Sequence, residues 1–223
     1  MPLDLLKPIT YLITSGATTA TTTPSSEDFS RLIKLVAAAV DARISLIQLR
    51  EKNLSARVLF ELARQSAEIT RGSATRLLVN DRADIARGAG ADGVHLTTRS
   101  LEARIVRRTF GEEFLIGAST HSIEEARAAC EGGADFVVFG PVFETASKRI
   151  YGEPIGLEQL SEVASNLAPF PIIALGGITI HNALECLRAG ARGIAGISLF
   201  NDVAALREIM QSVWSEPPAV AGG

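Results

Sequence analysis

One short phrase occurs three times in this chain: Ala89-Gly-Ala-Asp-Gly-Val94, Gly132-Gly-Ala-Asp-Phe-Val137 and Ala189-Gly-Ala-Arg-Gly-Ile194. Each copy follows an amphipathic stretch and leads into a short apolar one. Glycine adopts the left-handed conformation that ends a helix without a steric penalty, and a short apolar run after it is typical of a buried strand. The phrase therefore predicts a repeated order of helix, tight turn and strand, which is the pattern of a parallel α/β sheet.

Outward from these copies, the apolar runs predict eight strands. They are Ile9–Thr14, Ile44–Leu49, Arg76–Asn80, Gly93–Leu96, Leu115–Ser119, Phe136–Gly140, Ile172–Leu175 and Gly193–Ile197. The stretches between them have apolar residues at helical spacing, and a last helix is expected over Val203–Trp214. Eight such units fit an α/β protein that folds as one closed (β/α)8 TIM barrel over residues 1–214. An open doubly wound sheet is the alternative, disfavoured because no Gly-x-Gly-x-x-Gly follows the first strand.

The composition excludes several function classes. The chain has 223 residues, 47% of them hydrophobic, and a formal net charge of −3. No uncharged apolar run reaches the ~18 residues of a membrane span, and no basic run indicates nucleic-acid binding. Residues Met1–Lys7 lack the basic start and the long apolar stretch that are typical of a signal peptide. Cys130 and Cys186 are expected to be small buried side chains in a reducing compartment. We expect a cytoplasmic protein with a disordered Pro/Gly/Ala tail over residues 215–223.

In a barrel of this kind the chemistry lies at the carboxyl ends of the strands. The second strand ends in Gln48-Leu-Arg-Glu-Lys52. Alternation directs Gln48 and Arg50 to one face, and Lys52 follows just above them. The pattern predicts a polar, cationic mouth, with a surface charge cluster as the alternative.

The third strand ends in Asn80 and Asp81. Asn80 is a candidate for hydrogen bonding to a substrate, and Asp81 for binding Mg²⁺ or accepting from a donor. Either side chain is equally suited to capping the helix that follows, so both interpretations stay open. His95, within the fourth strand, is expected to be a packed, hydrogen-bonded histidine.

The fifth strand ends in Ser119-Thr-His121-Ser122. His121 leaves the strand just before a helix, and the positive end of the helix dipole favours the neutral imidazole that general acid–base catalysis needs. A loop histidine without a role is the alternative. Ser122 and Glu125 have the spacing of a capping box at the start of that helix.

Two long loops and two glycine-containing turns complete this face. The loop after the sixth strand offers Thr145 and Lys148 as donors for phosphate or carboxylate. The threonine-rich Ser15–Ser26 segment suits a flexible flap or a solvated linker. The turns after the seventh and eighth strands, which contain Gly176, Gly177, Ile197 and Ser198, match the place where barrels bind phosphate through backbone N–H groups.

Six motifs resemble the thiamine phosphate synthase superfamily. They are Gln48-Leu-Arg-Glu-Lys52, Asn80-Asp-Arg-Ala-Asp84, Gly90-Ala-Asp-Gly-Val-His95, Ser119-Thr-His121, Gly176-Gly-Ile178 and Ile197-Ser198. The resemblance extends from about Ile9 to the last helix and implies a barrel of thiamine biosynthesis that binds a thiazole phosphate. One branch, the synthase, joins a pyrimidine diphosphate to a thiazole phosphate with Mg²⁺ on the diphosphate. The other, the TenI tautomerase, isomerises a carboxylated thiazole phosphate to its aromatic form without a metal.

Departures from the synthase pattern favour the tautomerase. Synthases carry Gly-Gln-[Glu/Asp]-Asp after the fourth strand, and the last aspartate helps to hold the metal. This chain has Thr97-Thr-Arg-Ser100 there, with Arg99 expected to weaken a cation site. The loop Phe143-Glu-Thr-Ala-Ser-Lys148 also looks like the tautomerase rather than the synthase Pro-Thr-x-Thr-Lys.

Three activities follow from the resemblance. In the favoured one, His121 carries the proton, no cofactor is needed, and Gly177, Ile197 and Ser198 match the family's phosphate contacts. The first alternative is the synthase, with Asp81 as the surviving Mg²⁺ ligand. The second is a non-catalytic barrel that binds thiazole phosphate for regulation. A homo-oligomer is compatible with each.

Overall fold

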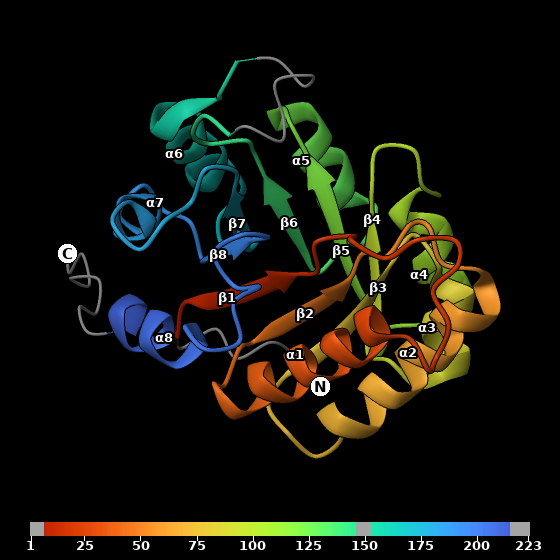
Figure 1. Ribbon diagram of the computed structural model, residues 1–223. Helices are drawn as coiled ribbons and strands as arrows, with labels where there is room; N and C mark the ends of the chain where they lie inside the picture. The colour runs from red at the N-terminus through yellow and green to blue at the C-terminus, as the bar shows by residue number, and fades with distance from the viewer. Residues whose placement is uncertain (1–6, 146–152, 215–223) are drawn as a thin grey trace.

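The computed structural model describes residues 7–145 and 153–214, which form a closed barrel of eight parallel strands. The strands follow one another in chain order, and β8 closes the barrel against β1 (Figure 1). The strands are β1 (Ile9–Ile13), β2 (Leu46–Leu49), β3 (Arg76–Asn80), β4 (Gly93–Leu96), β5 (Leu115–Thr120), β6 (Phe136–Phe139), β7 (Ile172–Leu175) and β8 (Gly193–Gly196). The barrel prediction is confirmed, and the open-sheet alternative is wrong.

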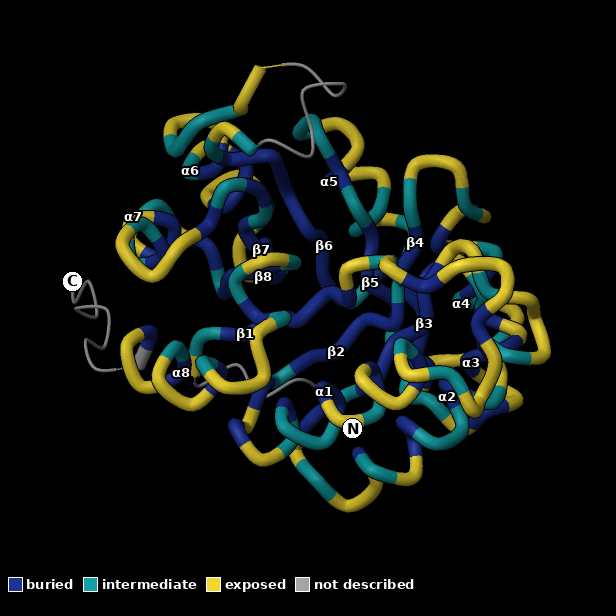
Figure 2. Tube along the Cα trace, viewed as in Figure 1, coloured by how far each residue is buried: buried dark blue, intermediate teal, exposed yellow. Residues whose placement is uncertain are grey.

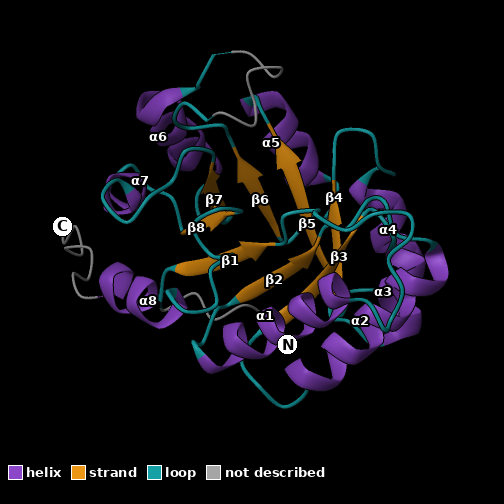
Figure 3. Cartoon of the chain, viewed as in Figure 1, coloured by secondary structure: helices purple, strands orange, loops and turns teal. Residues whose placement is uncertain are grey.

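One helix follows each strand, and the helices surround the sheet (Figure 3). They are α1 (Glu27–Asp41), α2 (Ala56–Thr70), α3 (Ala83–Ala89), α4 (Ala103–Phe110), α5 (Ile123–Glu131), α6 (Gly156–Leu167), α7 (Ala183–Arg188) and α8 (Leu206–Trp214). Strands β3, β4 and β7 have the expected bounds, and each of the other strands differs from its expected range by one or two residues at one end. The largest shift is at β2, which begins at Leu46 because Thr10 and Ser45 bond each other's backbone N–H through their side chains.

The repeated phrase does what its glycines predict. Gly90, Gly133 and Gly190 have φ values of 76°, 83° and 96°, the left-handed region that ends a helix. The aspartates of the first two copies add a second function. Asp92 accepts from the Leu77 N–H, and Asp135 accepts from the Ile116 N–H, so each carboxylate satisfies a backbone donor on the preceding strand.

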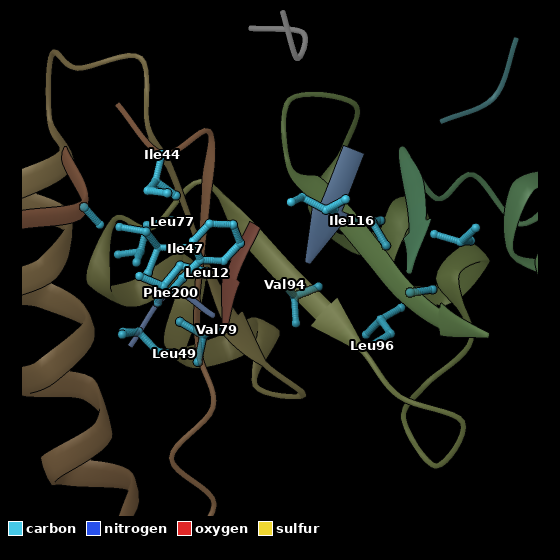
Figure 4. Close-up of a cluster of buried hydrophobic side chains, with 14 of the residues drawn as sticks. Leu12, Ile44, Ile47, Leu49, Leu77, Val79, Val94, Leu96, Ile116 and Phe200 are labelled. Atoms are coloured by element: carbon cyan, nitrogen blue, oxygen red, sulfur yellow. The ribbon is translucent and has the colours of Figure 1, made fainter. Parts of the chain in front are cut away.

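Alternation along the strands produces two apolar layers. Tyr11, Leu78, Phe136 and Ile173 belong to the smaller cluster, whose members take alternate positions in the strands and fill the barrel. The larger cluster joins the other strand face to the helices, and Figure 4 shows Leu12 and its neighbours within it. Most strand residues are buried in the tube of Figure 2, with intermediate positions in β3, β5 and β7, whereas exposed segments lie on the periphery. Burying one such side chain is worth about 1.5–3 kcal/mol.

Three further expectations concern the two cysteines, the start of the last helix and the C-terminal tail. Cys186 is buried, and desolvation raises its pKa to about 12, whereas Cys130 is only half-buried. The last helix begins at Leu206 rather than Val203, because the Asp202 side chain accepts from the Ala204 N–H in a preceding turn. The expected tail at 215–223 lies outside the described residues.

Candidate functional site

Polar side chains meet inside the barrel near the carboxyl ends of its strands. Gln48, Asn80 and His95 are buried on β2, β3 and β4, and Ser119 is half-buried on β5. Asn80 is in register with His95 across the β3–β4 pair. Four neighbouring strands therefore build a polar mouth. Of Gln48, Arg50 and Lys52, which were predicted to form a polar, cationic mouth, Gln48 lies among these side chains.

A chain of amides connects two of these strands. Gln48 Nε2 donates to Asn80 Oδ1 at 2.8 Å, and Asn80 Nδ2 donates to Asp81 Oδ2 at 2.7 Å. A carboxylate only accepts hydrogen bonds, so Asp81 fixes which way both amides point. Gln48 Oε1 consequently faces away from Asn80, and it is buried with no hydrogen-bond partner in the described part of the chain. A buried, unpartnered acceptor of this kind is suited to a ligand that donates.

Asp81 lies at the rim of the mouth in the left-handed region, with φ 60°. Its Oδ1 accepts hydrogen bonds from the hydroxyl groups of Thr97, at 3.1 Å, and Ser100. The capping alternative is wrong for Asn80 and Asp81, since α3 has Arg82 at its N-cap and no side-chain cap bond.

Whether this site can bind Mg²⁺ depends on Asp81. Among the described residues, no group of three His, Cys, Asp or Glu side chains is placed to hold a metal ion. Mg²⁺ is commonly bound by one or two carboxylates together with substrate phosphates and water, so Asp81 fits an ion that arrives with a phosphorylated substrate. The guanidinium of Arg99 is exposed, and in residues 7–145 and 153–214 it forms no ion pair with Asp81. The fixed cation expected there is therefore not found.

The β1–α1 loop is docked on the segment that follows β2. Glu51 is 3% exposed, and its carboxylate accepts from the Gly16 N–H, the Thr18 N–H and the Thr18 hydroxyl. A Cβ at Gly16 would lie 3.4 Å from the Arg50 guanidinium, so the loop backbone lies directly against Arg50. Of the two interpretations of the Ser15–Ser26 segment, the solvated linker is wrong for this part of it, because Thr18 and Thr22 are buried.

Arg50 and Lys52 differ in exposure. Arg50 is half-buried beside Gly16, and its backbone N–H donates to Thr14 Oγ1 at 2.8 Å. Lys52 is exposed. In the described residues the Glu51 carboxylate forms no ion pair with Arg50 or Lys52, and it anchors the loop instead.

His121 is half-buried just after β5. Its Nδ1 bonds the Gly140 carbonyl oxygen, and its backbone N–H donates to Glu125 Oε2 at 2.7 Å. A carbonyl only accepts, so Nδ1 carries the proton, and in the neutral ring Nε2 has the lone pair that a base needs. Ser122 caps α5 as predicted, but Glu125 bonds the N–H of His121 rather than that of Ser122, so the capping box is incomplete.

The glycine pair after β7 is required by close packing. A Cβ at Gly176 would lie 2.5 Å from Pro141 Cα, and a Cβ at Gly177 would lie 2.5 Å from the Glu144 carbonyl oxygen. Both have positive φ, at 102° and 64°. In the described residues, no acceptor bonds the backbone N–H of Gly177 or Ser198, which leaves two donors for the expected phosphate. Ile197 is half-buried next to Ser198, and its carbonyl accepts from the Asn201 side chain.

The last candidates lie in the β6–α6 loop. Thr145 is half-buried at the edge of the described segment, and Lys148 lies outside the described residues. Sequence reasoning missed Glu51 and Tyr11, whose hydroxyl bonds His95. The available signals were an acidic residue between two expected site cations and a tyrosine in a buried strand.

Comparison with known proteins gives a consistent family. The model of the family described as thiamine monophosphate synthase matches residues 19–200. A putative thiamine-phosphate synthase of Geobacter sulfurreducens is 47% identical over 167 residues, 75% of this chain and 78% of that protein. A thiamine-phosphate synthase of Roseiflexus castenholzii is 38% identical over 197 residues, 88% of this chain and 86% of that protein.

A solved structure agrees with these relatives. Thiamine phosphate pyrophosphorylase from Pyrococcus furiosus matches with a TM-score of 0.75 and 30% identity, over 94% of this chain and 98% of its own. Within the described segments, every helix is too short or too polar to cross a membrane.

Proposed function

Because the chain belongs to the thiamine monophosphate synthase family of thiamine-biosynthesis enzymes, we propose that it is the synthase: it joins a pyrimidine diphosphate to a thiazole phosphate and releases pyrophosphate. The relatives named above are synthases or pyrophosphorylases, which supports this activity over the tautomerase that the motif departures favour.

The unpartnered oxygen of Gln48 is the observation that carries the proposal. Gln48 is 2% exposed, and Asp81 orients its amide through Asn80 so that Oε1 is directed away from them. An aminopyrimidine has N–H donors that satisfy such an acceptor. A thiazole carboxylate has only acceptors to offer there, and it would leave the buried oxygen unsatisfied at a cost of about 1–3 kcal/mol.

The cations suit the diphosphate. Arg50 is held beside Gly16, and Lys52 is exposed above it. Negative charge accumulates on the departing pyrophosphate as the carbon–oxygen bond breaks, and fixed cations stabilise that charge. We assign Arg50, Lys52 and, from the loop beyond the described residues, Lys148 to this role.

Asp81 is the residue that would hold Mg²⁺, together with oxygens of the diphosphate. The bound ion would neutralise charge on the leaving group. Asn80 holds the Asp81 carboxylate in place through its amide. The thiazole phosphate is assigned to the backbone N–H groups of Gly177, Ile197 and Ser198, beside Gly176, and the hydroxyl groups of Ser119 and Thr145 are assigned to substrate binding.

A paired assay tests the proposal. One reaction holds pyrimidine diphosphate, thiazole phosphate and Mg²⁺; the other holds the non-aromatic carboxythiazole phosphate in chelator. We expect thiamine phosphate in the first. Aromatisation in the second reaction alone would overturn the synthase assignment, and binding of thiazole phosphate without turnover in either would indicate the regulatory alternative.

A matched substitution sharpens the assay. Gln48→Met keeps the side-chain length and removes the amide, so we expect a loss of about 10- to 100-fold in kcat/KM for the pyrimidine substrate. Gln65→Met on α2 is the control, because Gln65 bonds Glu61 on the outer surface. Equal effects of the two substitutions would contradict the role given to Gln48.

The tautomerase is the second candidate, and one contact favours it. Ser100 occupies the position at which synthases carry a second aspartate, and its hydroxyl bonds Asp81 directly. His121 then supplies the chemistry, since its Nδ1–H is held by Gly140 and Nε2 carries the lone pair. Such a ring can take a proton from the carbon that bears the carboxylate and return one to the exocyclic carbon.

A further inference from the structure

Three polar side chains form a hydrogen-bonded row inside the barrel. The Tyr11 hydroxyl lies 3.1 Å from His95 Nδ1, and His95 Nε2 lies 2.9 Å from Ser119 Oγ. Tyr11 is fully buried and His95 is 2% exposed, whereas Ser119 is half-buried near the carboxyl end of β5. The row therefore runs from the interior of the barrel to the mouth.

Packing holds the two rings of this row in place. Tyr11 meets Phe136 edge-on, with ring centroids 5.6 Å apart and an interplanar angle of 83°. His95 fits beside Phe136 because position 117 is a glycine, where a Cβ would lie 2.4 Å from the Phe136 ring and 2.9 Å from His95 Nδ1. The Tyr11 and His95 rings also contact each other, with centroids 5.7 Å apart, so the core packing supports the geometry of the hydrogen bonds.

The chemistry of the tyrosine decides the direction of both bonds. Its hydroxyl has one proton to donate, and burial raises the pKa of Tyr11, which keeps that proton in place. Among the described residues, His95 Nδ1 is the only hydrogen-bond partner of this hydroxyl. A proton on Nδ1 would leave the tyrosine proton without an acceptor in the core, which is unfavourable for a buried donor.

We propose that Tyr11 is a positioning residue: it keeps His95 in the Nε2–H tautomer, and His95 thereby keeps the Ser119 hydroxyl as a donor toward the mouth. Nδ1 accepts from Tyr11, Nε2–H donates to Ser119 Oγ, and the serine proton is left for an oxyanion or carbonyl oxygen of the ligand. No proton is transferred. The identity of the ligand, a phosphorylated substrate, rests on the proposed function, whereas the tautomer does not.

The tautomer is measured first, on the unmodified protein without substrate. Nitrogen-15 NMR distinguishes protonated from unprotonated ring nitrogens, and the variants His121→Ala and His181→Ala assign the signals of the three histidines. We expect the proton of neutral His95 on Nε2, and that of His121 on Nδ1, where it bonds Gly140. A proton on His95 Nδ1 would overturn the proposal whatever reaction the protein catalyses.

Substitution then tests whether Tyr11 acts through Ser119. Tyr11→Phe removes only the hydroxyl, and we expect a mixture of His95 tautomers and a loss of about 10-fold in kcat/KM, mostly through KM. Ser119→Ala should cost about as much, and the double variant no more than either single one. Additive losses would overturn the coupling.

Thr10→Val is the matched control. Thr10 is buried beside Tyr11 on β1, and its hydroxyl bonds Ser45 instead of a group in the mouth. We expect it to lower stability without changing the His95 tautomer or KM. A shift of the tautomer in this control would mean that any disturbance of β1 moves it, which contradicts a specific role of Tyr11.

Discussion

The hydroxyl of Ser100 donates a hydrogen bond to the carboxylate of Asp81, nineteen positions earlier in the chain. Thr97 donates to the same oxygen. Two carboxylates at this spacing would repel each other unless a cation lay between them, whereas a hydroxyl and a carboxylate attract. The contact joins the loops after β3 and β4 through a carboxylate and two hydroxyl groups.

Ser100→Asp should convert this rim into a Mg²⁺ site. The second carboxylate destabilises the protein in chelator through repulsion of Asp81, and Mg²⁺ should restore stability because it prefers carboxylate oxygens. Thermal unfolding with and without Mg²⁺, in the absence of substrate, measures both effects.

The control for this experiment is Ser100→Asn, which adds similar bulk without charge. Its unfolding temperature should respond to Mg²⁺ no more than that of the unmodified protein. A Ser100→Asp protein that is equally indifferent to Mg²⁺ would contradict the geometry given to Asp81.

Glu51→Gln should release the β1–α1 loop. The carboxylate accepts three hydrogen bonds from Gly16 and Thr18, and an amide turns an N–H₂ group toward at least one of these donors. We expect hydrogen exchange at the Gly16 and Thr18 amides to accelerate about 10-fold or more, and the KM for the diphosphate substrate to rise as Arg50 loses its neighbour.

Glu68→Gln is the comparison for Glu51. Glu68 lies on the surface of α2 in an ion pair with Arg64, which makes little difference to stability. If both substitutions leave exchange at Gly16 and Thr18 unchanged, the loop is held by something other than Glu51.

The barrel was predicted from the spacing of apolar residues along the chain. The polar mouth was predicted from the alternation of side chains along a strand. Glycines at the ends of helices located strands β4, β6 and β8. Alternation predicted that Gln48 and Arg50 share one face, and Gln48 is buried inside the barrel, whereas Asn80 was a candidate because it ends its strand. These are local rules, so a single sequence expresses them.

The partners of Asp81 and Glu51 could not be predicted in the same way. Ser100 and Thr18 are loop residues, and their hydroxyl groups reach the carboxylates only after the loops have folded against each other. The position of Arg99 could not be predicted either. Because Arg99 precedes Ser100, its guanidinium was expected near the Asp81 carboxylate, but the side chain is exposed to solvent. The residues that distinguish a synthase from a tautomerase lie in such loops, whereas the barrel follows from patterns within single strands and helices.

Asp135→Ala should destabilise the barrel more than Asp92→Ala. Asp135 accepts from the Ile116 N–H and from Arg107, which is itself mostly buried. Its loss leaves the Ile116 N–H without its acceptor, at about 1–3 kcal/mol. It also removes one of the acceptors of the Arg107 guanidinium, which still donates to the carbonyl groups of Gly111, Phe114 and Gly133. Asp92 pairs with the more exposed Arg76. Urea unfolding of both variants measures the difference, and equal midpoints would contradict it.

His121→Asn separates the two candidate reactions. The asparagine Nδ2 can replace the imidazole Nδ1–H as donor to Gly140, so the loop after β5 stays in place, but the variant has no ring nitrogen to act as a base. If the protein aromatises carboxythiazole phosphate through His121, this rate should fall about 100- to 10,000-fold. The synthase reaction, in which His121 moves no proton, should change by only a few-fold. His181→Asn, the same substitution at an exposed histidine, controls for the chemical change. A synthase rate that falls as far as the tautomerase rate would place His121 in substrate binding and remove its assignment as a base.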